Sequence, residues 1–178
     1  MISSEEEALR AVLARVQNQH DTCYAAAEPD FELMPMYFLL KRGETHLSLG
    51  IPSIPPGGKD MVVALVAAKA ADEGCDGYVF TSEGWTVPPE NVALVLPGES
   101  LSGRPDRIEV LNVEAGLAGG QSAFLIAHIK RTPDHSPVLE WKSVIYNEAG
   151  GENCQSRFNI FNPRAPQVPD SFVSHRQH

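Results

Sequence analysis

Four residues near the middle of the chain have side chains that could act together: Glu83, Trp85, Arg107 and Glu109. Residues at alternate positions of a strand lie on one face of a sheet, so Glu83 shares a face with Trp85, and Arg107 shares one with Glu109. The Arg107 guanidinium could bind the Glu83 carboxylate through two parallel N–H groups. The functional interpretation is a small polar pocket, with Trp85 as a stacking wall, Arg107 as an anion-binding group and Glu83 or Glu109 as a base.

The same residues also have a structural interpretation. Glu83 lies among strong β-formers, where a carboxylate needs a partner. An ion pair with Arg107, shielded by Trp85, would hold the loop of residues 88–105 in place. Structural ion pairs are common, and catalysis would bring more polar groups to the site. The sequence therefore favours the structural interpretation over the functional one.

Well-known catalytic and ligand-binding motifs are missing from the sequence. Gly57-Gly58-Lys59-Asp60 precedes a predicted helix but lacks the spacing and the Ser or Thr of a phosphate-binding P-loop. Ser122 does not lie in a complete G-x-S-x-G motif. The histidines lack the spacing of metal ligands, and Cys23, Cys75 and Cys154 form no C-x-x-C pair. We therefore expect no metal site and no cofactor.

Part of the chain resembles a group of uncharacterised bacterial and phage proteins. Those proteins pair a helix with a Glu-Ala-Trp strand and continue with a Pro-x-Arg-x-Glu strand. The similar residues here are Ala70–Phe80, Ser82-Glu83-Gly84-Trp85, and Pro105-Asp106-Arg107 with Glu109. Gly84 stands in place of the alanine. The group has no known activity, so the resemblance implies only that the four residues introduced above belong together.

A helix over Met61–Glu73 is predicted just before these residues. The prolines and glycines of residues 55–58 break the preceding structure, and Asp60 is expected to be the N-cap. Gly74 suits the left-handed position after the last turn. The helix is apolar on nearly every side, which is typical of a buried helix. We accordingly expect Leu65→Ala to destabilise the protein by about 2–5 kcal/mol.

Two strands should position the four residues themselves. They are predicted over Gly77–Val87 and Arg107–Ala115, joined by a proline- and glycine-marked excursion, residues 88–103, over the surface. If the strands pair as antiparallel neighbours, Glu83 and Arg107 can meet on one face of the sheet.

Further elements complete the prediction. Ser3 or Ser4 caps an amphipathic helix of about four turns, whose apolar positions 9, 12, 13 and 16 repeat at helical spacing. Arg42-Gly43 is expected to join two strands, and Pro35 favours an edge position for the first of them. The remaining strands are predicted over these ranges: Phe31–Lys41, Glu44–Ile51, Gln121–Arg131, Val138–Asn147 and Arg157–Phe161.

The predicted fold is a single α+β domain over residues 1–162, followed by a proline-rich C-terminal tail over residues 163–178 that wraps the surface or frays. Short connections favour a largely antiparallel sheet, with the 61–73 helix buried on it and the N-terminal helix packed beside that helix.

The composition limits which binding partners and which cellular location are expected. The net charge of −9 and the pI near 5.1 argue against nucleic acid and anionic membranes as partners, since both attract clustered Lys and Arg. No stretch approaches the roughly 18 apolar residues of a membrane span. Residues 1–7 are acidic and lack the apolar core of a secretion signal, and the cysteine count is odd, so we expect a cytoplasmic protein.

Three classes of function remain open from the sequence. A non-catalytic interaction or scaffold domain is favoured, with a homodimer formed through sheet edges near Met34 and Phe158 or through the N-terminal helix, and with a protein partner possible. The alternative is a small-molecule enzyme that uses Glu83 and Arg107 near Trp85. The third is an acidic inhibitor that mimics nucleic acid, although the acidic residues are scattered.

Overall fold

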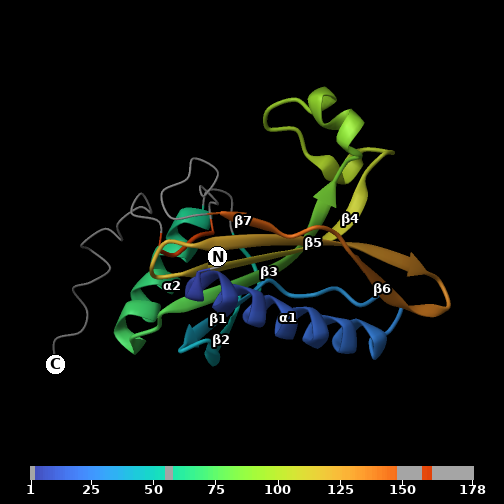
Figure 1. The fold of residues 1–178 in the computed structure, drawn as a ribbon. Helices are drawn as coiled ribbons and strands as arrows, with labels where there is room; N and C mark the ends of the chain where they lie inside the picture. The colour runs from blue at the N-terminus through green and yellow to red at the C-terminus, as the bar shows by residue number, and fades with distance from the viewer. Residues whose placement is uncertain (1–2, 55–57, 148–157, 162–178) are drawn as a thin grey trace.

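The computed structural model of the protein describes residues 3–54, 58–147 and 158–161. It confirms an α+β fold in which helices pack on both faces of an antiparallel sheet (Figure 1). Alternate residues of the central strand separate the two layers. Val79 belongs to the apolar cluster beneath the N-terminal helix, whereas Tyr78 and Phe80 belong to the cluster beneath the second helix.

Among the described residues the sheet has seven strands, and every neighbouring pair of them is antiparallel. The strand order is β2-β1-β3-β4-β5-β6, with β7 paired to part of β5. The strands are β1 (Met36–Lys41), β2 (Glu44–Gly50), β3 (Gly77–Thr86), β4 (Ile108–Leu117), β5 (Ser122–Thr132), β6 (His135–Trp141) and β7 (Ile145–Asn147). The edge position predicted for the first strand is wrong, because β1 lies between β2 and β3. Pro35 precedes β1 and therefore removes no ladder donor from it.

Helix α1 (Ser4–Ala25) begins as predicted, but the prediction that it packs beside the second helix is wrong, because the two helices lie on opposite faces of the sheet. The Ser3 hydroxyl accepts a hydrogen bond of 3.1 Å from the Glu6 backbone N–H, and the apolar stripe at positions 9, 12, 13 and 16 is buried. At 22 residues the helix is longer than expected, because His20 and Tyr24 continue the buried stripe. Its residues pack mainly across β4 and β6 (Figure 1).

Helix α2 (Lys59–Glu73) covers the opposite face of the sheet. Gly74 adopts the predicted left-handed conformation with φ of 64°, whereas the N-cap is Gly58 and Asp60 lies in the first turn. The prediction that this helix is buried on nearly every side is wrong for the single chain. Val63, Val66 and Ala70 are buried, but Leu65 is 49% exposed. Apolar composition therefore identified the helix, while the sheet covers only one of its sides.

Strands β3 and β4 form the long antiparallel pair that the sequence predicts, with Glu83 opposite Leu111 and Trp85 opposite Glu109. We call the connecting residues 87–107 the arm. The arm contains two short 3₁₀ helices, η1 (Pro89–Leu94) and η2 (Leu101–Gly103), and neither has a buried residue. In Figure 1 the arm projects beyond the sheet, whereas the sequence suggested an excursion over the surface.

The last predicted strands differ in detail from the observed ones. Residues 142–144 interrupt the strand expected over 138–147, which becomes β6 and β7. Residues 158–161 form a turn, and the side chains of Phe158, Ile160 and Phe161 pack into the cluster beneath α2. The prediction of sheet edges near Met34 and Phe158 is therefore wrong: among the described residues, β2 forms one edge of the sheet, and β6 and β7, which both pair with β5, form the other. Arg157 and the predicted tail, residues 163–178, lie outside the described residues.

Candidate functional site

Arg131 is the centre of the site that contains Glu83 and Glu109. The Arg131 Nε lies 2.9 Å from both Glu109 carboxylate oxygens, and its Nη2 lies 2.8 Å from Glu109 Oε1. The same Nη2 lies 3.4 Å from Glu83 Oε2. One guanidinium at the end of β5 thus binds the carboxylates of β3 and β4 on the face of the sheet that α1 covers.

Other side chains and backbone groups complete this network. The Tyr24 hydroxyl of α1 donates a hydrogen bond of 2.5 Å to Glu83 Oε1, and the Leu33 backbone N–H donates to the same carboxylate. Arg131 Nη1 donates to the Pro29 carbonyl oxygen at 3.3 Å. The network therefore joins α1 and the following segment, residues 26–35, to three strands of the sheet.

Burial sets the electrostatics of the site. The side chains of Glu83, Glu109 and Arg131 are only 13%, 20% and 23% exposed. Loss of solvent raises the pKa of Glu83 above its ordinary value, although the hydrogen bonds from Tyr24 and Leu33 and the charge of Arg131 oppose the shift. The hydrogen bond to Glu109 raises the pKa of Arg131, so this guanidinium keeps its charge.

Arg107 takes no part in this network, which corrects the predicted ion pair between Glu83 and Arg107. The strand register places Leu111, not Arg107, opposite Glu83. Arg107 precedes Leu111 by four positions, which is about 13 Å along a strand. Its guanidinium instead lies over the Trp85 ring, with Cζ 4.4 Å from the ring centroid. The structure thus groups Glu83 with Glu109 and groups Trp85 with Arg107.

The hydrogen bonds around Arg131 already use part of the acceptor capacity of both carboxylates. A general base needs a lone pair aimed at a substrate proton, but both carboxylates already accept hydrogen bonds from neighbouring groups. This favours a structural role for Glu83 and Glu109. The sequence analysis missed Arg131, although strand alternation places it on the same face as Ala127 and Ile129, which are buried beneath α1.

A second polar network holds the arm. Arg104 binds both Asp106 oxygens through Nε and Nη2, at 2.9 and 3.0 Å, and donates through Nη1 to Glu99 at 3.1 Å. Asn91 Nδ2 donates to Asp106 at 2.8 Å, and Glu99 accepts the Leu96 backbone N–H at 2.9 Å. The Arg104 guanidinium holds the pKa of Asp106 below its usual range.

Apolar side chains project from this braced arm. Val92, Leu94 and Leu96 are 57%, 64% and 70% exposed. Trp85 lies at the base of the arm and is also exposed. An exposed apolar group is normal when it is isolated, but neighbouring groups of this kind mark binding surfaces.

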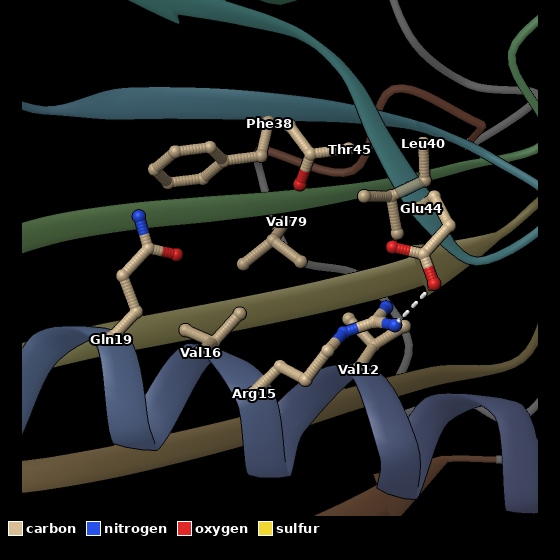
Figure 2. Close-up of a pocket in the computed structure, with 9 residues that line it drawn as sticks. All are labelled: Val12, Arg15, Val16, Gln19, Phe38, Leu40, Glu44, Thr45 and Val79. Carbon is tan, nitrogen blue, oxygen red and sulfur yellow. Dashed lines mark hydrogen bonds and ion pairs between the residues drawn. The ribbon is translucent and has the colours of Figure 1, made fainter.

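A third feature is a pocket of about 210 Å³ between α1 and the first three strands (Figure 2). Its floor is apolar and contains Val16, Phe38 and Val79. At its rim Arg15 Nη1 lies 2.7 Å from Glu44 Oε1, so this cation already has a partner (Figure 2). The pocket is a gap beside α1 rather than a site with convergent polar groups.

Two further kinds of feature are missing from the described part of the chain. Within residues 3–54, 58–147 and 158–161, no group of three or more His, Cys, Asp or Glu side chains is arranged to hold a metal ion. Among the same residues, none of the helices has the length and apolar character needed to cross a membrane.

Comparison of the chain with protein-family models, with curated proteins and with solved structures finds no match.

Proposed function

We propose that this protein is a non-catalytic interaction domain that binds another protein through its arm. The observation that carries the proposal is the exposure of Val92, Leu94 and Leu96, each more than half exposed on a segment that projects from the sheet (Figure 1). Burying such side chains in a partner contributes roughly 1–2 kcal/mol for each one. A projecting segment can reach into a recess, which the flat face of a sheet cannot do.

The bracing of the arm adds to this support. Arg104 ties Glu99 and Asp106 together in the second half of the arm, and Asn91 ties Asp106 to the first half, so the apolar residues between them are held in one arrangement. A preorganised segment loses less conformational freedom on binding than a free loop would. We therefore assign to the Arg104 network the role of holding Val92, Leu94 and Leu96 in place for binding.

The chemistry of the arm points to an apolar recess in a protein as the partner surface. Arg104 pairs with both Glu99 and Asp106 and offsets one of their two charges, while the exposed large side chains Val92, Leu94 and Leu96 offer apolar contacts. The net charge of −9 opposes approach to an anionic membrane surface. The alternative function, an enzyme using Glu83, has less support because Tyr24 and Arg131 occupy that carboxylate.

A triple variant tests the proposal. Proteins retained by the immobilised wild-type chain but not by Val92→Ser/Leu94→Ser/Leu96→Ser are identified, produced in pure form and titrated against both chains by calorimetry. We expect the triple variant to bind the purified partner at least about tenfold more weakly, because its three apolar contacts are lost. Its melting temperature should equal that of the wild type, since all three side chains are exposed.

Val138→Ser is the matched control, because Val138 is 63% exposed on β6 and lies outside the arm. This variant should bind the partner as tightly as the wild type. Equal affinity of the wild type and the triple variant for every purified partner would show that the arm is not the binding surface.

A further inference from the structure

A short turn near the C-terminus packs on the side of the sheet that α2 covers. It comprises Phe158, Asn159, Ile160 and Phe161, and we call it the C-terminal turn. Asn159 and Ile160 are only 9% and 5% exposed. The Asn159 side-chain oxygen accepts a hydrogen bond of 2.9 Å from the Phe161 backbone N–H, so the turn orders its own backbone. Among the described residues it pairs with none of the strands, and side-chain contacts therefore join it to the sheet.

The surface beneath the turn is a row of three aromatic rings, Tyr37 of β1 with Tyr78 and Phe80 of β3, which we call the aromatic row. The Tyr37 ring centroid lies 4.6 Å from that of Phe80 and 6.1 Å from that of Tyr78. The Tyr78 hydroxyl donates a hydrogen bond to the Glu114 carboxylate of β4. Because these contacts lie within the sheet, the aromatic row is ordered without help from the turn.

Each phenylalanine of the turn meets one ring of the aromatic row. The Phe158 ring stacks on Phe80, with 4.3 Å between the centroids and 17° between the planes. The Phe161 centroid lies 5.9 Å from that of Tyr78. Aromatic pairs in such arrangements are favourable beyond the apolar area that they bury. The turn thus spaces its two phenylalanines to match Phe80 and Tyr78.

Two polar groups of the fold also contact the turn. The Tyr37 hydroxyl donates a hydrogen bond of 2.9 Å to the Phe158 carbonyl oxygen. Tyr37 is fully buried, so its hydroxyl needs a partner, and the main chain of the turn supplies it. At the start of α2, Lys59 Nζ lies over the Phe158 ring, 5.9 Å from the centroid. Pockets for side-chain anchors and hydrogen bonds to the main chain are the means by which proteins bind short peptides.

We infer that the aromatic row is a binding site for peptide segments with the pattern Phe-Asn-x-Phe, and that the C-terminal turn occupies it as an internal ligand. The pattern follows from the contacts: one phenylalanine for Phe80, an asparagine that closes the turn, and a second phenylalanine for Tyr78. The partner is a protein that carries a segment of this pattern, which binds when the internal turn leaves. Residues 148–157 separate the turn from β7 in the sequence, a length of chain that allows the turn to leave while β7 stays paired.

The internal turn controls access to the site. A covalently attached ligand competes strongly with a free one, because its attachment keeps it at a high local concentration. The wild-type chain should therefore bind an added segment weakly, and a chain whose own turn has lost its anchors should bind the segment well. This behaviour is independent of the proposed function of the arm, which shares no residue with the turn or the aromatic row.

The probe is a synthetic peptide of residues 156–163, Ser-Arg-Phe-Asn-Ile-Phe-Asn-Pro, with fluorescein at its N-terminus. Fluorescence anisotropy measures its binding to the full-length wild type and to the full-length double variant Phe158→Ala/Phe161→Ala. We expect the double variant to bind the peptide at least about tenfold more tightly, because its own turn no longer competes. The control peptide has alanine at both phenylalanine positions and should bind neither chain. A double variant that binds the probe no more tightly than the wild type does overturns the inference.

The folding of the double variant separates an internal ligand from an essential part of the core. Since the aromatic row is ordered by contacts within the sheet, the double variant should keep the circular dichroism spectrum and the cooperative melt of the wild type. An unfolded double variant would show that the sheet needs the turn, and would also overturn the inference. The single variant Phe161→Ala keeps one anchor and should bind the peptide with an intermediate affinity. An affinity no higher than that of the wild type would contradict competition by the turn.

Tyr37 tests where the peptide binds. Tyr37→Phe in the double-variant background keeps the ring but removes the donor to the peptide carbonyl, so it should weaken peptide binding roughly two- to tenfold. Tyr146→Phe in the same background is the matched control, because Tyr146 of β7 contacts Arg10 and lies outside the aromatic row. It should leave the affinity unchanged. Equal affinities of the two variants would place the peptide elsewhere and overturn the inference, as would a double variant that binds the intact wild-type chain but not the peptide.

Discussion

The Tyr24 hydroxyl in the last turn of α1 donates a hydrogen bond of 2.5 Å to the Glu83 carboxylate in β3, and the two residues are 59 positions apart. Through Glu83, Tyr24 is joined to Arg131 and so to β5. This contact is long-range and partly buried, and it fixes the end of the helix against the sheet. Glu83, which the sequence analysis considered as a possible catalytic base, therefore connects helix α1 to the sheet.

The first prediction concerns the charge at the centre of that connection. Arg131→Met should lower the free energy of unfolding by about 2–4 kcal/mol, because it removes the cation shared by two carboxyl groups that are mostly shielded from solvent. Urea unfolding at pH 7 measures the loss. Replacing both acids by glutamine in the Arg131→Met background should recover much of it, because no unpaired carboxylate would remain.

Arg107→Met is the matched control for this experiment. Arg107 is exposed and contacts the Trp85 ring, so its removal should cost less than about 1 kcal/mol. If Arg107→Met destabilised the protein as much as Arg131→Met, the assignment of Arg131 as the partner of the two acids would be wrong.

The second prediction compares a leucine buried beneath α2 with a leucine on the exposed side of that helix. Leu39 is fully buried in β1 beneath α2, whereas Leu65 is 49% exposed. Leu39→Ala should cost about 2–5 kcal/mol, whereas Leu65→Ala should cost less than about 1 kcal/mol in the monomer. Thermal melts at low protein concentration compare identical substitutions in two environments. Equal losses would mean that α2 is covered on both sides within one chain.

Leu65 also shows what the sequence could and could not predict about the helices. The breaking residues before α2 and Gly74 after it predict where the helix lies, since these signals are local. Which sides of a nearly all-apolar helix are covered depends on the tertiary packing, about which periodicity gives no information. The N-cap is Gly58 and not the predicted Asp60, because the exact end of a helix varies by a residue or two around the position that local signals indicate.

The candidate site shows the same division between local and long-range information. Alternation along the strands assigns Glu83 to one face of β3 and Glu109 to one face of β4, and these two strands do pair in the antiparallel sense. The register of that pair is set across the arm, and a connection this long does not fix register as a two-residue turn does. The sequence therefore suggested Arg107, in the next strand along the chain, as the partner of Glu83, and only the sheet order brings Arg131 of β5 to that carboxylate.

The third prediction concerns the order of the arm. Arg104→Met removes the cation that binds Asp106 and Glu99, so the Leu96 N–H should lose its Glu99 acceptor for much of the time. Hydrogen exchange of residues 88–103 should become at least about tenfold faster, while the amides of β3 keep their protection. Lys142→Met is the control, because Lys142 pairs with Glu140 far from the arm along the chain. Unchanged exchange in the arm would exclude a bracing role for Arg104.

The final prediction concerns pH and rests on His20, a buried residue on the sheet-facing side of α1. Burial lowers the pKa of His20 from 6.5 to about 4, against a smaller opposing effect of Asp21. Between these values the unfolded chain binds a proton that the folded chain does not. Stability contributed by neutral His20 is therefore complete above pH 6.5 and is lost as the pH falls toward 4.

Urea unfolding at several pH values between 4.5 and 7 measures this loss, which should be on the order of 1–3 kcal/mol. Glu83 acts in the opposite sense, because its pKa is raised and its contribution is lost as the pH rises through the folded value. The informative quantity is thus the difference in the free energy of unfolding between the wild type and His20→Phe. The phenylalanine keeps an aromatic ring beside Tyr24 but cannot titrate. This difference should change with pH over the range in which His20 titrates. A difference between the wild type and His20→Phe that is constant across this range would show that His20 is not held in its neutral form by burial.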